Sequence, residues 1–190
     1  MNEEIYDDKV FEKEVYTRLN INGKEFQSCR FIKCDLSNSD LSKNRFFDCV
    51  FEGCNLSLVK LSGSSLNSVV FRQCKITGVN FNECDDFLFS VQFEHCVLDY
   101  ASFFGKKMPK TKFIKTSLKE ANFDQTNLQG SLFDETDLAG AVFNKTNLAN
   151  VSFSTAFNFN IDPELNNIKK AIFSLDGLLG LLVKHNIIVK

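Results

Sequence analysis

A large apolar residue recurs at every fifth position from Ile21 to Phe153, and this spacing constrains the fold more than any other feature of the chain. A strand alternates every two residues and a helix buries a stripe with a period near 3.6, so a sustained period of five fits neither. A short fixed period is typical of a solenoid, in which each unit buries its apolar residue by stacking between neighbours. The series has 27 members and one change of spacing, seven residues between Phe81 and Leu88.

The residue two positions before each large one is small, and the two halves of the chain fill this position differently. In the C-terminal half it is mostly Ala, Ser or Thr, whereas in the N-terminal half cysteine is common. Stacked cysteines would lie within reach of a disulfide, but their odd number, the lack of an export signal and their inward phase favour free thiols that pack as small apolar residues. All seven cysteines occupy this position: Cys29, Cys34, Cys49, Cys54, Cys74, Cys84 and Cys96.

Three-residue units with the order small, Asn and large apolar carry a family resemblance. Examples are Ala121-Asn122-Phe123, Thr126-Asn127-Leu128 and Thr146-Asn147-Leu148. Over residues 11 to 153 the chain resembles the pentapeptide-repeat proteins, whose consensus is Ala-(Asp/Asn)-Leu-X-X. The resemblance implies an all-β solenoid, a right-handed quadrilateral β-helix with four repeats in each 20-residue coil and about seven coils in this chain.

Residues 20 apart should then stack on the same side of successive coils, and the cysteines follow this rule. Cys34 and Cys74 lie in one such column. If the two extra residues are assigned to the region of Asp85 and Asp86, Cys96 continues the same column. The sequence therefore predicts a surface bulge at this point that leaves the stack of coils intact.

The pattern changes after Phe153. Asp162-Pro163-Glu164 has the composition of a helix start, which predicts a short helix from Leu165 to Lys170, a leucine-rich α-helix from Ser174 and a strand at the end of the chain. We therefore expect a β-helix with a short lead-in over residues 1–160, and a capping and dimerisation module over residues 161–190. The apolar residues expected in a two-fold interface are Leu175, Leu178, Leu179, Leu181, Leu182, Ile187, Ile188 and Val189.

Composition excludes several classes of protein. The chain carries 24 acidic and 22 basic residues, and its N-terminus has no apolar run, so we expect a cytoplasmic protein without membrane contact. The cysteines are spread along columns rather than paired at zinc-site spacing. The two histidines, His95 and His185, lack neighbours that would form a catalytic triad. We therefore expect no enzyme activity, no cofactor and no metal.

The repeat pattern is locally irregular near Lys106, which occupies a small inward position. A lysine is costly to bury without a partner, so either this corner bulges outward with the register preserved or the side chain snorkels past a small neighbour. Two interpretations remain open: a solvated face with a tolerated defect, or a surface that contacts a partner. The residues of the candidate partner surface are Asp85, Asp86, Gly105, Lys106, Lys107, Pro109 and Lys110.

The leucine-rich end followed by Asn186-Ile187-Ile188-Val189 resembles one branch of the family, the quinolone-resistance (Qnr) and mycobacterial fluoroquinolone-resistance proteins. That resemblance implies a homodimeric rod that mimics duplex DNA, binds DNA gyrase or topoisomerase IV without itself binding nucleic acid, and protects the enzyme from drugs or toxins. Duplex DNA is densely anionic, whereas this chain has a net charge of only −2. The alternative hypothesis is a structural or interaction scaffold for an unidentified protein partner.

Overall fold

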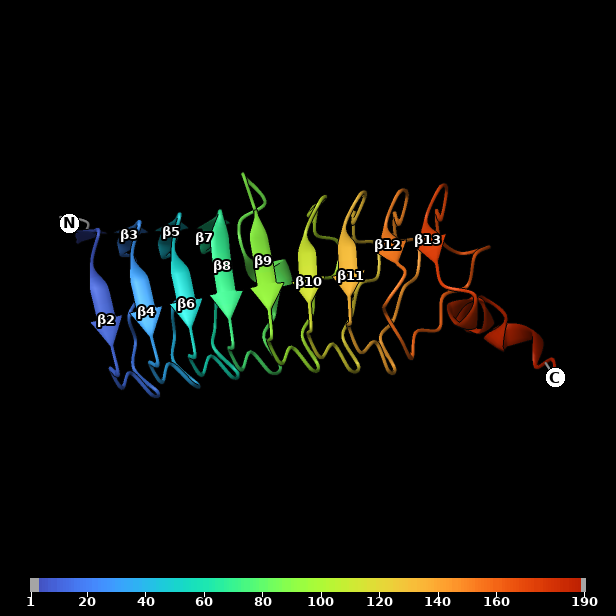
Figure 1. Ribbon diagram of the computed structural model, residues 1–190. Coiled ribbons are helices and arrows are strands. Elements are labelled where there is room, and N and C mark those ends of the chain that lie inside the picture. The colour runs from blue at the N-terminus through green and yellow to red at the C-terminus, as the bar shows by residue number, and fades with distance from the viewer. Residues whose placement is uncertain (1–3, 189–190) are drawn as a thin grey trace.

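In the computed structural model, which describes residues 4–188, the chain winds into a parallel β-solenoid of about eight turns. Figure 1 shows the strands side by side along a rod, with the two ends of the chain at opposite ends. One sheet contains β1 (Ile5–Asp7), β3 (Glu25–Gln27), β5 (Arg45–Phe47) and β7 (Ser65–Asn67). The other contains β2 (Val10–Glu12), β4 (Arg30–Ile32), β6 (Val50–Glu52), β8 (Val69–Arg72), β9 (Val91–Glu94), β10 (Lys112–Ile114), β11 (Leu132–Asp134), β12 (Ser152–Phe153) and β13 (Ile172–Phe173).

Two further sides of each coil are held by single parallel bridges, which gives the coil four sides. One series begins with Val15 paired to Asp35, and the other begins with Asn20 paired to Asp40. Each side takes five residues, so partners lie 20 residues apart, as the period of five predicts. The β-helix prediction is confirmed, and the solenoid is longer than predicted because it extends from Ile5 to Phe173.

A continuous column of stacked phenylalanine rings runs through the core. Neighbouring ring centroids are 4.5 to 5.3 Å apart. Across the two-residue insertion, the centroids of Phe71 and Phe93 are 5.3 Å apart, within the same range. The insertion therefore leaves the stack intact, as predicted. The column consists of Phe11, Phe31, Phe51, Phe71, Phe93, Phe113, Phe133, Phe153 and Phe173.

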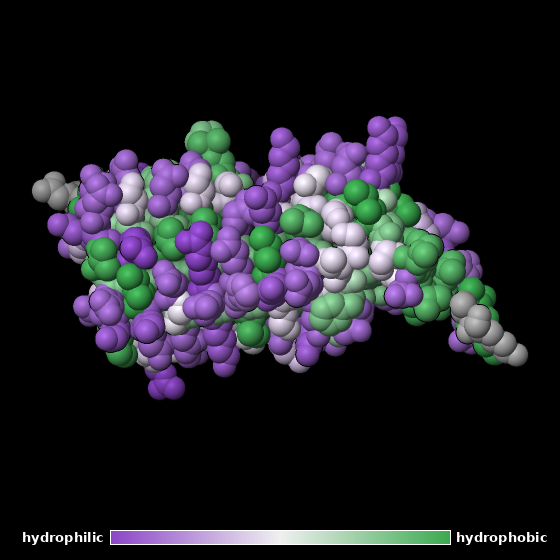
Figure 2. Space-filling view, viewed as in Figure 1, coloured by the Kyte–Doolittle hydropathy of each residue, from purple (hydrophilic) through white to green (hydrophobic). Residues whose placement is uncertain are grey.

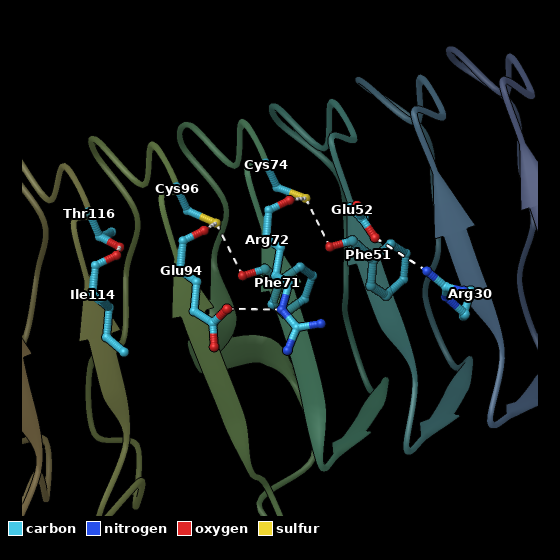
Figure 3. Close-up of polar contacts among 10 residues, drawn as sticks. All are labelled: Arg30, Phe51, Glu52, Phe71, Arg72, Cys74, Glu94, Cys96, Ile114 and Thr116. Carbon is cyan, nitrogen blue, oxygen red and sulfur yellow. Dashed lines mark hydrogen bonds and ion pairs between the residues drawn. The ribbon is translucent and has the colours of Figure 1, made fainter.

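Where the small inward position holds Cys or Thr, it supplies a hydrogen-bond donor as well as a small volume. The thiol of Cys74 donates to the backbone oxygen of Phe51, with sulfur and oxygen 3.4 Å apart (Figure 3). In the other half, the hydroxyl of Thr126 donates to the backbone oxygen of Phe103 at 2.8 Å. Each donor lies 23 residues after its acceptor. All seven cysteines are buried and free, so their prediction as packing residues is confirmed.

The helix predicted over residues 165–170 is wrong, because this segment continues the solenoid. Asn166 is buried and its amide donates to the backbone oxygen of Phe143 at 2.8 Å, again 23 residues earlier. Asn167 pairs with Asn147 in a parallel bridge. Asn166-Asn167-Ile168 keeps the order small, Asn and large apolar, and the stacking of this unit on the previous coil overrides the local helix-start signal.

The C-terminal module is formed by two short 3₁₀ helices, η2 (Asp176–Leu181) and η3 (Val183–His185), rather than the predicted α-helix. Glycine is a poor helix former, and Gly180 packs so closely on the last coil that a Cβ there would lie 2.5 Å from the backbone oxygen of Phe159. Ile187 and Ile188 form no strand. Val189 lies outside the described residues. No helix within residues 4–188 is long and apolar enough to cross a membrane.

Candidate functional site

The two-residue insertion forms a loop that projects from the rod just before β9. Figure 1 shows this loop standing above its neighbours, and Figure 2 shows an apolar projection at the same place. The exposed fraction is 79% for Phe87 and 59% for Leu88. The spacing predicts that Leu88 points inward as a repeat residue, but Phe89 is buried in its place. We call residues 85–88 the insertion loop.

Lys106 lies in the core directly beneath the insertion loop. Its exposed fraction is 2%, so the corner keeps its register and does not bulge outward. The ammonium donates to the carboxylate of Asp86 at 2.7 Å and to the backbone oxygen of Cys84, and it lies 4.8 Å from the ring centroid of Phe89. A buried lysine needs such partners. The two irregularities of the sequence therefore compensate each other, since the insertion supplies the partners of Lys106.

The base of the insertion loop is also fixed by backbone contacts. The backbone N–H of Asp85 donates to the backbone oxygen of Ser64 at 2.9 Å, and the hydroxyl of Ser65 donates to the Asp85 carboxylate at 3.2 Å. Burial raises the pKa of the Cys84 thiol to about 12, although the charge of Lys106 lowers it in part. The thiol is therefore protonated at neutral pH and acts as a packing residue under the loop.

The other residues of the candidate partner surface are exposed. The lysines from Lys106 to Lys119, in contrast, do not form one patch. Gly105, Lys107, Pro109 and Lys110 are exposed, whereas buried Lys106 is not available to a partner. Successive five-residue units lie on successive sides of the coil, so the lysines between residues 106 and 119 are distributed around the rod. Besides Lys106, two of them form ion pairs among the described residues, Lys115 with Glu135 at 3.6 Å and Lys119 with Asp137 at 3.3 Å.

Charges of opposite sign are paired along the nine-stranded sheet. Arg72 and Glu94 are 2.9 Å apart (Figure 3). Arg30 and Glu52, two coils towards the N-terminus, are 3.4 Å apart. Acidic and basic residues are thus mixed on this side of the rod, which differs from the uniform negative charge of duplex DNA.

The C-terminal module leaves most of its apolar residues uncovered. Val183 is 54% exposed, and six residues that the sequence assigns to a two-fold interface also have large exposed fractions: Leu175 (87%), Leu178 (43%), Leu179 (49%), Leu182 (36%), Ile187 (55%) and Ile188 (86%). Of the other two residues expected in that interface, Leu181 is instead partly buried against the core, and Val189 lies outside the described residues.

Sequence reasoning missed Phe87. It assigned the two extra residues to the region of Asp85 and Asp86, and did not consider the aromatic residue after them. The available signal was the run Phe87-Leu88-Phe89, which holds three large apolar residues where a repeat can bury only one. Within residues 4–188, no group of three or more His, Cys, Asp or Glu side chains could hold a metal ion.

Comparison with known proteins agrees with this architecture. A variant of QnrB1, described as a plasmid-mediated fluoroquinolone resistance protein, superposes with a TM-score of 0.60 and 17% identity over 99% of this chain and 98% of its own. HetL, a pentapeptide repeat protein involved in heterocyst differentiation regulation in the cyanobacterium Nostoc, superposes with a TM-score of 0.59 and 14% identity over 92% of this chain and 90% of its own.

Family comparisons are more specific. No curated protein matches the chain. Residues 24–103 match the family described as "Pentapeptide repeat region", and residues 109–156 match "Pentapeptide repeats (8 copies)". Together these segments cover more than half of the sequence and coincide with the stacked coils. The chain therefore belongs to the pentapeptide-repeat family.

Proposed function

We propose that this chain is a non-catalytic protein-binding rod and that the insertion loop is its recognition element. The observation that carries the proposal is the exposure of Phe87 and Leu88 at the tip of a loop whose base is bonded to buried Lys106. Large apolar side chains on a fixed support bind a partner with little loss of conformational entropy, and aromatic residues often dominate such interfaces.

A type II topoisomerase is the candidate partner that the resemblance of the C-terminal sequence to the Qnr proteins implies. The match to QnrB1 extends over nearly the full length of both chains, and QnrB1 is a fluoroquinolone resistance protein. The mixed charges on the nine-stranded sheet count against contact by DNA mimicry. On this proposal the rod would instead engage the enzyme through the insertion loop and would reduce its poisoning by fluoroquinolones.

The decisive experiment measures DNA supercoiling by gyrase with a fluoroquinolone present and the purified protein titrated in. We expect the protein to restore supercoiling, and a Phe87→Ser/Leu88→Ser variant to lose this effect. Tyr100→Ser is the matched control, because Tyr100 is also a large exposed residue (66%) but lies outside the loop.

Failure of the unmodified protein to restore supercoiling would contradict the topoisomerase proposal. The broader proposal has a separate test, photo-crosslinking from position 88 in cells that produce the protein. A discrete crosslinked protein band that is absent when the crosslinker replaces Tyr100 supports recognition by the loop. Identical bands from both positions would contradict it.

We further propose that the exposed leucines of the C-terminal module join two rods into a dimer. The free chain has a mass of 21.6 kDa, so twice that mass, about 43 kDa, is expected by light scattering. Leu178→Asp or Leu182→Asp should yield a monomer, because a charge at the apolar contact cannot be solvated there. A monomeric unmodified protein would refute the proposed dimer.

A further inference from the structure

The N-terminal end of the rod is an apolar opening. A cavity of about 310 Å³ leads from the first coil into the core. Tyr6, Phe11, Tyr16 and Ile21 line its entrance, and Phe26 lies deeper. These entrance residues are only partly buried, although their equivalents in the next coils are fully enclosed. No other segment within residues 4–188 covers this opening.

The outer surface of the first coil is also unusually apolar. The exposed fractions are 60% for Ile5, 57% for Val10 and 69% for Val15. One coil later the equivalent positions hold Glu25, Arg30 and Asp35. Terminal units of a solenoid usually have a polar outer face, so an apolar rim around an apolar opening indicates a surface that a partner covers.

The first coil also differs from the later coils in its backbone hydrogen bonds, because backbone N–H groups of each later coil donate to the coil before it. The backbone N–H of Glu25 donates to the oxygen of Glu4, and the backbone N–H of Arg30 donates to the oxygen of Lys9. The equivalent N–H groups of Ile5 and Val10 have no preceding coil among the described residues. An unpaired strand edge of this kind accepts an added strand.

Charge distinguishes between the possible occupants. Along β1, β2 and their flanks, residues 4 to 14 hold five acidic residues, Glu4, Asp7, Asp8, Glu12 and Glu14, against two lysines, Lys9 and Lys13. The other basic residues near the opening are Arg18 and Lys24, and Lys24 is paired with Glu4. Two copies of this end would therefore bring like charges together, which opposes self-association. We propose that the N-terminal end binds a basic, apolar extended segment of another protein, which adds a strand to the open edge and places an apolar side chain in the opening.

The chain offers a local reporter for this site. It contains no tryptophan and three tyrosines, and two of these, Tyr6 and Tyr16, line the entrance. A Tyr100→Phe variant therefore carries tyrosine only at the opening. The probe is an acetylated, amidated peptide of alternating Arg and Ile, about seven residues long to span one side of a coil and its flanks, which contributes no tyrosine fluorescence.

We expect saturable quenching or enhancement of tyrosine emission with this peptide. The acidic counterpart with Glu in place of Arg should bind on the order of ten-fold more weakly. An N-methylated basic peptide should also bind more weakly, because it cannot pair with the strand edge. Asp7→Lys/Asp8→Lys should weaken the basic peptide on the order of five-fold. The variant should fold, since Lys13 and Lys33 adopt the same positive φ as Asp8.

Glu120→Lys/Asp124→Lys, far from the opening, is the matched charge control. Equal binding of the acidic and basic peptides would overturn the proposal, as would indifference to Asp7 and Asp8 or to N-methylation. A lack of any fluorescence response at millimolar peptide would also overturn it. These outcomes are independent of the insertion loop, so they leave the proposed function untouched.

Discussion

The rod has two halves that build the same coil from different residues. In the N-terminal half the small inward position is often a cysteine, and in the C-terminal half it is often a threonine. Cys49 donates to the backbone oxygen of Phe26 at 3.3 Å, and Thr136 donates to that of Phe113 at 3.0 Å. The position therefore requires a small volume, which Ala and Val also supply, and where it is polar either a thiol or a hydroxyl can donate to the residue 23 positions earlier.

The second column of aromatic rings also differs between the halves. In the N-terminal half, Phe26 stacks on Phe46 at 5.0 Å, one side away from the continuous column. In the C-terminal half, Phe103 stacks on Phe123 at 5.1 Å, on the side of the coil opposite the continuous column. The change occurs around the insertion. A core tolerates such exchanges when the total volume of each layer is preserved.

The largest effect is expected at the junction of the halves. Lys106→Thr installs the residue typical of the C-terminal half but leaves the insertion loop without its buried partner. Loss of this lysine should lower the free energy of unfolding by about 2 to 4 kcal/mol, measured by urea denaturation.

A second variant makes this prediction specific. Deleting Asp86 and Phe87 joins Cys84-Asp85 to Leu88 and restores a unit like Cys34-Asp35-Leu36. The deletion alone should also destabilise, because it leaves the Lys106 ammonium buried without Asp86. The two changes together should recover most of the loss. Simple additivity of the two effects would show that loop and lysine are not coupled.

The next largest effect is expected from alkaline pH, because it ionises the cysteine thiols of the N-terminal half but not the threonine hydroxyls of the C-terminal half. Burial raises the pKa of the Cys49 thiol to about 12, whereas an exposed thiol in the unfolded chain titrates near 9. The unfolded state therefore loses its proton first as the pH rises. Stability is fully present below pH 9 and falls between pH 9 and 12, by about 1.4 kcal/mol per pH unit for this thiol. Cys49→Thr should flatten the fall in urea midpoints measured from about pH 8 to about pH 10.5, and an unchanged slope would contradict the assignment.

A smaller effect is expected from removing one hydroxyl in the C-terminal half. Thr126→Val keeps the shape but removes the donor to the Phe103 oxygen, which retains a bond from the Lys106 N–H at 3.0 Å. The loss should be about 1 kcal/mol in denaturant unfolding. Thr126→Ser keeps the donor and serves as the control. If serine proves more damaging than valine, packing rather than hydrogen bonding dominates this position.

The smallest effect is expected from replacing a buried thiol with a hydroxyl at neutral pH. Cys49→Thr places a hydroxyl where the thiol already donates to Phe26, so the stability at neutral pH should change by less than about 1 kcal/mol. Thermal unfolding followed by circular dichroism measures this. A loss of several kcal/mol would mean that the halves are not interchangeable in this position.

The sequence predicts the coil but not its exceptions, for physical reasons. The period of five identifies the buried positions. It therefore predicts the inward residues, the cysteine columns and the intact stack at the insertion. The contact between Lys106 and Asp86 depends on the conformation of the insertion loop, which no periodicity encodes. The 3₁₀ helices and the final coil depend on packing against Phe159 and Asn147, and that packing overrides local helix signals such as Pro163.

Because each side of the coil takes one five-residue unit, the length of the chain also sets the direction in which surface features face. Loss or duplication of one unit between the insertion loop and the C-terminal module would turn one relative to the other by a quarter of a revolution while the core stayed stacked. Loss of four units would restore the original orientation and shorten the rod by one layer. The angle between two binding surfaces can thus be changed in discrete steps during evolution or design, without redesigning either surface.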